Sequence, residues 1–174
     1  MPPPRFLPEV PLPPYAHVPG KTPHPESDPA GHSFGQPRPE AAPVDPARWR
    51  DSREYLRGLD LFNHGYYWEA HEQWEALWHA AGRRGPLADF LKGLIRLAAA
   101  GVKAREGRPE GVISHARSAA RLLRAGAELD PYPCGLDLGR LIAHAEQVAA
   151  SPPRPADGSP VVFAFTLAPV EAPT

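Results

Sequence analysis

The sequence is poor in cysteine and has no large excess of charge of either sign, and both features exclude whole classes of protein. Cys134 is the only cysteine among 174 residues, which rules out a disulfide within the chain and a zinc site built from cysteines alone. We therefore expect a reducing, cytoplasmic location. The formal net charge at pH 7 is −1, so the broad basic surface with which most nucleic-acid-binding proteins neutralise phosphate is missing. We expect no nucleic-acid partner.

Long apolar runs are missing as well. The N-terminal segment MPPPRFLPEV lacks the apolar stretch behind a basic end that marks a secretory signal. The most apolar segment, FLKGLIRLAAAGV, is short and contains Lys92 and Arg96, whereas a membrane span needs roughly 20 apolar residues. We expect a soluble protein with no membrane partner.

Proline, in contrast, is abundant near the N-terminus, where 15 of the 25 prolines lie within residues 1–46. Because proline removes amide donors and fixes φ, this composition predicts an N-terminal arm, residues 1–44, that forms neither helices nor central strands. Residues 1–14 and 36–44 have the composition of a plain linker. Between them, PYAHVPGKTPHPESDPAGHSFG combines aromatic residues and histidines with β-turn signals. We expect this part of the arm, residues 15–35, to dock on the rest of the protein.

Apolar residues recur at helical spacing throughout residues 45–150, which predicts a bundle. Capping residues and stop signals predict three helices with both ends defined, from Pro46 to Gly65, from Tyr67 to Ala81 and from Pro86 to Glu106. A fourth helix is predicted to begin at Pro109, and a fifth to begin after an N-cap at Asp137. The third is apolar around most of its circumference, which is typical of a central helix. Residues 151–174 contain VVFAFTL between prolines, which favours an extended tail. The predicted fold class is all-α: a compact bundle of about five helices with a proline-rich arm and a short extended C-terminal tail.

The second predicted helix, within YYWEAHEQWEALWH, carries ionisable groups among its tryptophans. At 100° per residue, His71 and Glu75 lie one turn apart and are expected inside the tryptophan face, with Glu72 on its boundary and Glu69 on the opposite side. A carboxylate buried there carries a desolvation cost of several kcal/mol unless it is paired, protonated or bound to a metal. The sequence therefore predicts a buried polar cluster, with the candidate members His71, Glu72, Glu75, Trp78, Asn63, Tyr67 and His115.

Three interpretations of this cluster remain open. It can be structural, with each polar atom paired to a neighbouring helix so that the bundle keeps one register. It can hold one divalent metal ion, because the i, i+4 spacing lets His71 and Glu75 point at one ion while His24 and His32 approach from the arm. HEQWE is nevertheless not the HExxH pattern of metalloproteases, since glutamate replaces the second histidine. Finally, the cluster can be a metal-free pocket for a small molecule.

Two functions follow from these interpretations, and the sequence leaves open whether the protein is an enzyme. The leading hypothesis is a noncatalytic binding or interaction module whose partner is a small molecule or a protein. The alternative is a metal-assisted hydrolase that uses the HEQWE helix with the arm histidines and has Glu72 as general base. A homo-oligomer is also open, in which Trp49 or Trp74 would lie at the dimer contact.

The stretch LFNHGYYWEAHEQWEALWHAA, followed by FLKGLIRLAAAGVKAREGRPEGVISHARSAARLL, resembles the uncharacterised all-helical family catalogued as domain of unknown function 309. The family pattern FNxGxYxxAHExxExxW is filled by Phe62, Asn63, Gly65, Tyr67, Ala70, His71, Glu72, Glu75 and Trp78. The chain departs from the pattern at Arg96, where glutamine is usual, and at the turn of Gly107 and Arg108, where glycine and asparagine are common. The resemblance covers residues 55–125 and implies a compact helical bundle with no established activity. The arm also resembles an N-terminal extension of some members, which implies that it belongs to the functional unit.

Overall fold

The computed structural model of the chain describes residues 1–38 and 40–170, and it confirms an all-α fold. Its elements are the 3-10 helix η1 (Pro46–Asp51), α1 (Arg53–Asn63), α2 (Tyr67–Ala80), α3 (Pro86–Arg105), α4 (Pro109–Ala127), the 3-10 helix η2 (Pro133–Gly135) and α5 (Leu138–Ala150). The only β pairing in the described ranges is one isolated antiparallel bridge between Ala156 and Ser159. Residue 39 of the predicted arm and residues 171–174 of the predicted tail lie outside the described residues.

The first predicted helix is interrupted, which corrects the expectation of one helix from Pro46 to Gly65. Arg48 leaves the helical region, with φ of −125° and ψ of 34°, and Ser52 adopts an extended conformation. The Ser52 hydroxyl accepts a hydrogen bond from Tyr55 N at 3.2 Å and so caps the N-terminus of α1. The segment thus contains two start signals, Asp45 before η1 and Ser52 before α1, and each begins its own helix.

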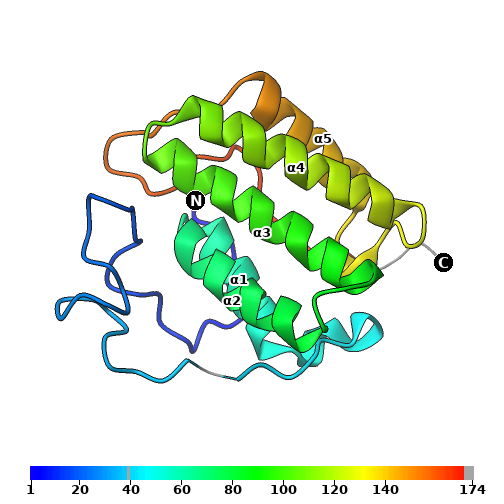
Figure 1. Cartoon of the computed structure of the whole chain (residues 1–174), viewed down its shortest axis with the longest axis horizontal. Coiled ribbons are helices and arrows are strands. Elements are labelled where there is room, and N and C mark those ends of the chain that lie inside the picture. The colour runs from blue at the N-terminus through cyan, green and yellow to red at the C-terminus, as the bar shows by residue number, and fades with distance from the viewer. Residues whose placement is uncertain (39, 171–174) are drawn as a thin grey trace.

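Consecutive helices pack side by side from α1 to α5, and α3 lies in the middle of the bundle (Figure 1). Most residues of α3 are buried, as its apolar circumference predicts. The close approach of α3 to the Tyr67 ring of α2 requires glycine at position 101, since a Cβ on Gly101 would lie 2.5 Å from Tyr67 Cγ. None of the helices in the described part of the chain is both long and apolar enough to cross a bilayer.

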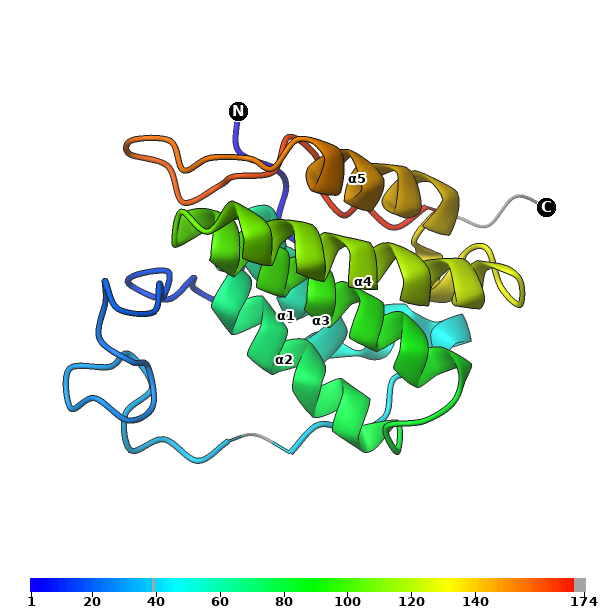
Figure 2. The same ribbon diagram turned by 45° about the horizontal axis from the view of Figure 1, so that its top comes forward.

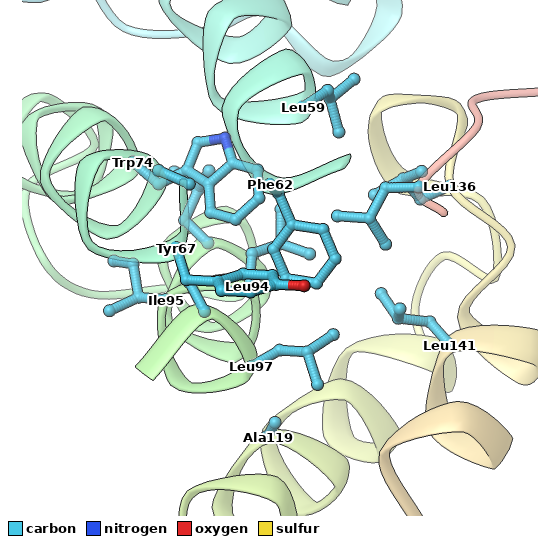
Figure 3. Packing of buried hydrophobic residues seen from close by; sticks show 14 of the residues in the cluster. Leu59, Phe62, Tyr67, Trp74, Leu94, Ile95, Leu97, Ala119, Leu136 and Leu141 are labelled. Carbon is cyan, nitrogen blue, oxygen red and sulfur yellow. The ribbon is translucent and has the colours of Figure 1, made fainter. Parts of the chain in front are cut away.

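Aromatic rings from α1 and α2 fill the centre of the core, against leucines of α3 and of the segment before α5 (Figure 3). Phe62 lies between Tyr67 and Trp74, with ring centroids 5.3 and 5.9 Å away. The core continues into both irregular ends of the chain, because Leu7 of the arm and Leu167 of the tail are buried in the same cluster. Arm and tail are therefore integral parts of the fold.

The C-terminal tail lies extended over the bundle and is held by two side chains at the two ends of the α1 to α2 connection. Asn63 pairs with the backbone of Leu167 in both directions: its Nδ2 donates to the carbonyl at 2.9 Å, and its Oδ1 accepts from the amide at 2.7 Å. The Tyr67 hydroxyl accepts from Val162 N at 3.0 Å. Phe163 stacks on Phe62 at 5.5 Å, so the tail closes this side of the core.

Apart from its first residues, the N-terminal arm runs along the α2 side of the bundle (Figures 1 and 2). Its first anchor is Asp60 of α1, a fully buried carboxylate. Asp60 accepts hydrogen bonds from the amides of Phe6 at 2.7 Å and Leu7 at 2.9 Å, and it forms an ion pair with Arg5 at 3.0 Å. The expectation that residues 1–14 are plain linker is therefore wrong, because two amides and one cation of this segment satisfy a buried charge.

Candidate functional site: a cavity between the arm and the second helix

Helix α2 directs its tryptophans to different surroundings, and only Trp74 enters the core. The buried face of α2 is centred on Ala70, Trp74 and Leu77. His71 and Glu75 each follow a buried residue and so lie about 100° around the helix from it. Their side chains are 29% and 32% exposed, so the expectation that both groups are buried is wrong. They lie at the edge of the buried face, where water lowers the desolvation cost of a charge.

The opposite side of α2, predicted to face away from the core, is covered by the arm. Glu69 is buried there, with a side chain only 6% exposed. Its Oε1 accepts from the amide of His17 at 2.8 Å and lies 3.0 Å from Nε2 of His32. Its Oε2 is also buried and has no hydrogen-bond partner among the described residues. The Glu69 carboxylate therefore binds the arm at His17 and at His32, which are 15 residues apart in sequence, through Oε1 alone. Its Oε2 stays unpaired within the described part of the chain.

A histidine-rich loop of the arm packs against Trp68 next to this carboxylate. The rings of His17 and His24 meet the Trp68 ring edge to face, with centroids 5.1 and 5.4 Å away. Burial lowers the pKa of His17, while the Glu69 carboxylate opposes this change. The lowered pKa favours the neutral imidazole of His17, whose Nδ1 shares a 2.7 Å hydrogen bond with Thr22 Oγ1. These contacts connect His17 and His24 of the arm to α2.

His71, Glu72 and Glu75 form a small group of ligand-type atoms at the edge of α2. Nδ1 of His71 lies 3.4 Å from Oε1 of Glu72 and 3.7 Å from Oε2 of Glu75, and one ligand atom from each residue fits within 4.8 Å of the other two. The neighbouring His71 lowers the pKa of Glu72, an effect that burial opposes and Arg38 reinforces. The arrangement can accept one divalent cation between an imidazole and two carboxylates.

A half-open cavity of about 930 Å³ lies between the arm and the two helices α1 and α2. Its acidic side chains are Glu26, Glu40, Glu69, Glu72 and Glu75, and its basic ones are Arg38 and Arg57. Arg38 connects the two walls, because it donates to Glu26 of the arm at 2.6 Å and lies 3.5 Å from Glu72 of α2. Trp68 and several prolines of the arm supply apolar surface. The cavity thus exists only when the arm is docked.

Several predicted site residues lie elsewhere. Asn63 and Tyr67 bind the tail, as described above. His24 accepts from the amides of Glu26 and Ser27, and His32 binds Glu69, whereas the ligand-type atoms that lie close to His71 come from Glu72 and Glu75.

Four other residues of the sequence-based hypotheses, on α2 and on other elements, take structural positions. The ammonium nitrogen Nζ of Lys92 lies over the ring of Trp78, 4.0 Å from the ring centroid. Burial lowers the pKa of His115 on α4, and the positive charges of Arg96, Lys103 and His71 lower it further. Trp74, considered for a dimer contact, is fully buried within the single chain, and Trp49 is nearly so.

Sequence reasoning missed the carboxylates Asp60 and Glu69. Asp60 lies between Leu59 and Leu61, before Phe62. A charge in the middle of so apolar a stretch is a signal of a buried, paired group. Glu69 gives no such signal, because it lies on the side of α2 that would face solvent if the arm did not cover it.

Residues 55–114 match the protein family described as Domain of unknown function (DUF309), which confirms the resemblance seen in the sequence. The matched segment covers α1, α2, α3 and the first part of α4, including Asp60, Glu69, His71, Glu72 and Glu75. The arm lies before the matched segment. No curated protein matches the chain.

Proposed function

We propose that this protein is a binding module whose ligand is a small molecule held in the cavity between the arm and α2. The observation that carries the proposal is the cavity itself: about 930 Å³, half open, with an apolar surface at Trp68 and ionisable groups from two segments far apart in sequence. Ligand sites commonly occupy roughly 300 to 1,000 Å³ and combine an apolar lining with a few convergent polar groups.

The way in which the arm is attached supports this proposal. Its contacts with α1 and α2 are made to buried charges, Asp60 and Glu69, rather than through apolar packing alone. Buried carboxylates tolerate few geometries, because each lost partner leaves a desolvated charge. The arm is therefore positioned accurately enough to serve as one wall of a specific site.

Replacing Ala76 by tryptophan should abolish ligand binding, since Ala76 lines the cavity and an indole would fill it. We would screen the full chain against a small library of amine, carboxylate and neutral aromatic fragments by saturation-transfer NMR. Fragments that bind the parent should lose their signal with Ala76→Trp and keep it with Ala143→Trp, which places the same side chain on the exposed face of α5. Hits that persist in Ala76→Trp would place binding outside the cavity and contradict the proposal.

A metal-assisted hydrolase is the second candidate, and the geometry of His71, Glu72 and Glu75 favours it. Glu72 and Glu75 also line the cavity, so an ion held there would touch the bound ligand. Three protein ligands leave coordination positions open, and the ion would supply Lewis-acid polarisation of a carbonyl or phosphoryl group. Glu72 then serves as a ligand, which is a different role from the general base that the sequence suggested.

Metal uptake tests this candidate directly. Titration of the full chain with Mn²⁺ and Zn²⁺, followed by calorimetry, should show one site that loses at least about tenfold in affinity in His71→Ala and Glu75→Gln. Glu128→Gln removes an exposed carboxylate at the end of α4 and should bind like the parent. Absence of a stoichiometric site, or equal affinity in all three variants, would remove the hydrolase from consideration.

A further inference from the structure

We infer that the ligand of the cavity is a linear organic polycation of the polyamine class, held by carboxylates on successive turns of α2. The inference rests on the proposed function, because it assigns a ligand chemistry to the same cavity. It differs from the metal candidate in two residues: Glu69 belongs to the polycation site and not to the metal group, whereas His71 belongs to the metal group and does not line the cavity.

The charge of the cavity wall selects a cation. Five glutamates face two arginines, and both arginines already have acceptors. Arg38, whose side chain is 72% exposed, binds Glu26 and Glu72, and Arg57 donates to the carbonyls of Val10 and Pro11. An anionic ligand would meet uncompensated carboxylates, and like charges brought together in a partly desolvated site weaken binding strongly.

The spacing of the carboxylates selects an elongated ligand. Glu69, Glu72 and Glu75 follow one another every three residues, so each lies about 4.5 Å further along the axis of α2 and about 60° further around it, and all three line the cavity. Amines joined by three or four methylenes have nitrogen atoms about 5 to 6 Å apart when bonds of about 1.5 Å are extended. A flexible linear triamine can follow this curved row and direct its ammonium groups to successive carboxylates, which a compact cation cannot do.

Glu69 gives the strongest indication of a ligand group. A buried carboxylate needs partners for both oxygens, yet its Oε2 has none among the described residues while its Oε1 binds the amide of His17 and the ring of His32. An ammonium group carries three N–H donors and a full charge, and it satisfies such an oxygen better than a neutral donor. Glu69 also lines the cavity, so its unpaired oxygen belongs to the same site as Glu72 and Glu75.

The apolar part of the lining suits the methylene segments between the amines. Trp68, Leu12 and Leu61 line the same cavity as the carboxylates. A tryptophan ring attracts a cation by its face and packs against methylene groups beside it. Alternation of carboxylates with apolar surface favours a polyamine over a hydrated metal ion, which has no apolar segment to bury.

Calorimetric titration of the full chain with spermidine at low salt tests the inference. We expect one site, with affinity about tenfold lower in Glu75→Gln and in Glu69→Gln, since each substitution removes one charge-assisted contact. Glu128→Gln, which removes an exposed carboxylate far from the cavity lining, should bind spermidine like the parent. Putrescine should bind more weakly than spermidine, and butylamine, with one charge, more weakly still.

The controls separate failure of this inference from failure of the proposed function. Glu69→Gln also touches the arm, so Glu75→Gln, which leaves both hydrogen bonds of Glu69 to the arm intact, is the deciding variant. Spermidine binding that is unchanged in Glu75→Gln, or in Ala76→Trp, would overturn the polycation inference. If fragments bind in an Ala76→Trp-sensitive way while spermidine does not bind, the cavity remains a binding site and only its ligand class is wrong.

Discussion

Replacing Asp60 by alanine is expected to lower the free energy of unfolding by about 3 kcal/mol and the melting temperature by about 9 °C. The substitution removes the acceptor of two backbone amides, Phe6 N and Leu7 N, and the ion-pair partner of Arg5. Breaking a buried ion pair costs roughly 3 to 5 kcal/mol, because the remaining charge stays desolvated. We expect the lower end of that range, since the Arg5 side chain is 19% exposed and can turn toward water.

Urea denaturation followed by far-ultraviolet circular dichroism measures this effect. Asp51→Ala is the matched control, because Asp51 lies on the surface and forms an exposed ion pair with Arg48, which contributes less than about 1 kcal/mol. The arm should also become sensitive to proteases in Asp60→Ala, and fragments that require the cavity should bind more weakly. Equal stability of the two variants would show that the arm contributes little to the fold.

The helical part of the structure could be predicted because it depends on local signals. Pro86 and Pro109 at first helical positions, and the cap at Asp137, set helix starts that the structure reproduces. The break at Ser52 was missed although serine is a common N-cap, because the apolar spacing continues across it. A periodic pattern does not show whether the backbone between two apolar residues stays helical.

The arm could not be predicted in the same way, because its partners are distant in sequence. Asp60 lies 53 residues from Leu7, and Glu69 lies 52 residues from His17. On a helical wheel Glu69 belongs to the solvent side of α2, and only the covering arm makes it a buried anchor. The edge position of His71 and Glu75 has a related cause: a wheel gives angles, but the packing of α1 and α3 decides where the buried arc ends.

The end of α1 holds both irregular segments of the chain. Asp60 binds the arm, and Asn63, one turn later, binds the tail. Gly65 completes this region: its φ of 86° favours glycine, and a Cβ there would lie 2.5 Å from the backbone of Pro160. Because the arm also forms one wall of the cavity, the geometry of the candidate site depends on the same short stretch of α1 that fixes the tail.

Replacing Asn63 by aspartate is the second change with a large expected effect, of about 3 kcal/mol on the free energy of unfolding. The new carboxylate would lie 2.9 Å from the carbonyl oxygen of Leu167, where the amide now donates, and it would be buried without a donor of its own on that side. The cost has an upper limit, because the tail can detach instead. Detachment of the tail loses the burial of Phe163 and Leu167, at roughly 1.5 to 3 kcal/mol each. The free energy of unfolding therefore falls by a similar amount whether the tail stays in place beside the new carboxylate or detaches.

Hydrogen exchange separates these two outcomes of Asn63→Asp. The amide of Leu167 donates to Asn63 at 2.7 Å and that of Val162 to Tyr67 at 3.0 Å, so both should exchange much faster if the tail is released, and only the first if the tail stays in place. Gln147→Glu makes the same chemical change on the exposed side of α5 and should leave stability and exchange unchanged. An Asn63→Asp variant as stable as this control would mean that the paired amide of Asn63 does not hold the tail, and that burial of Phe163 and Leu167 alone does.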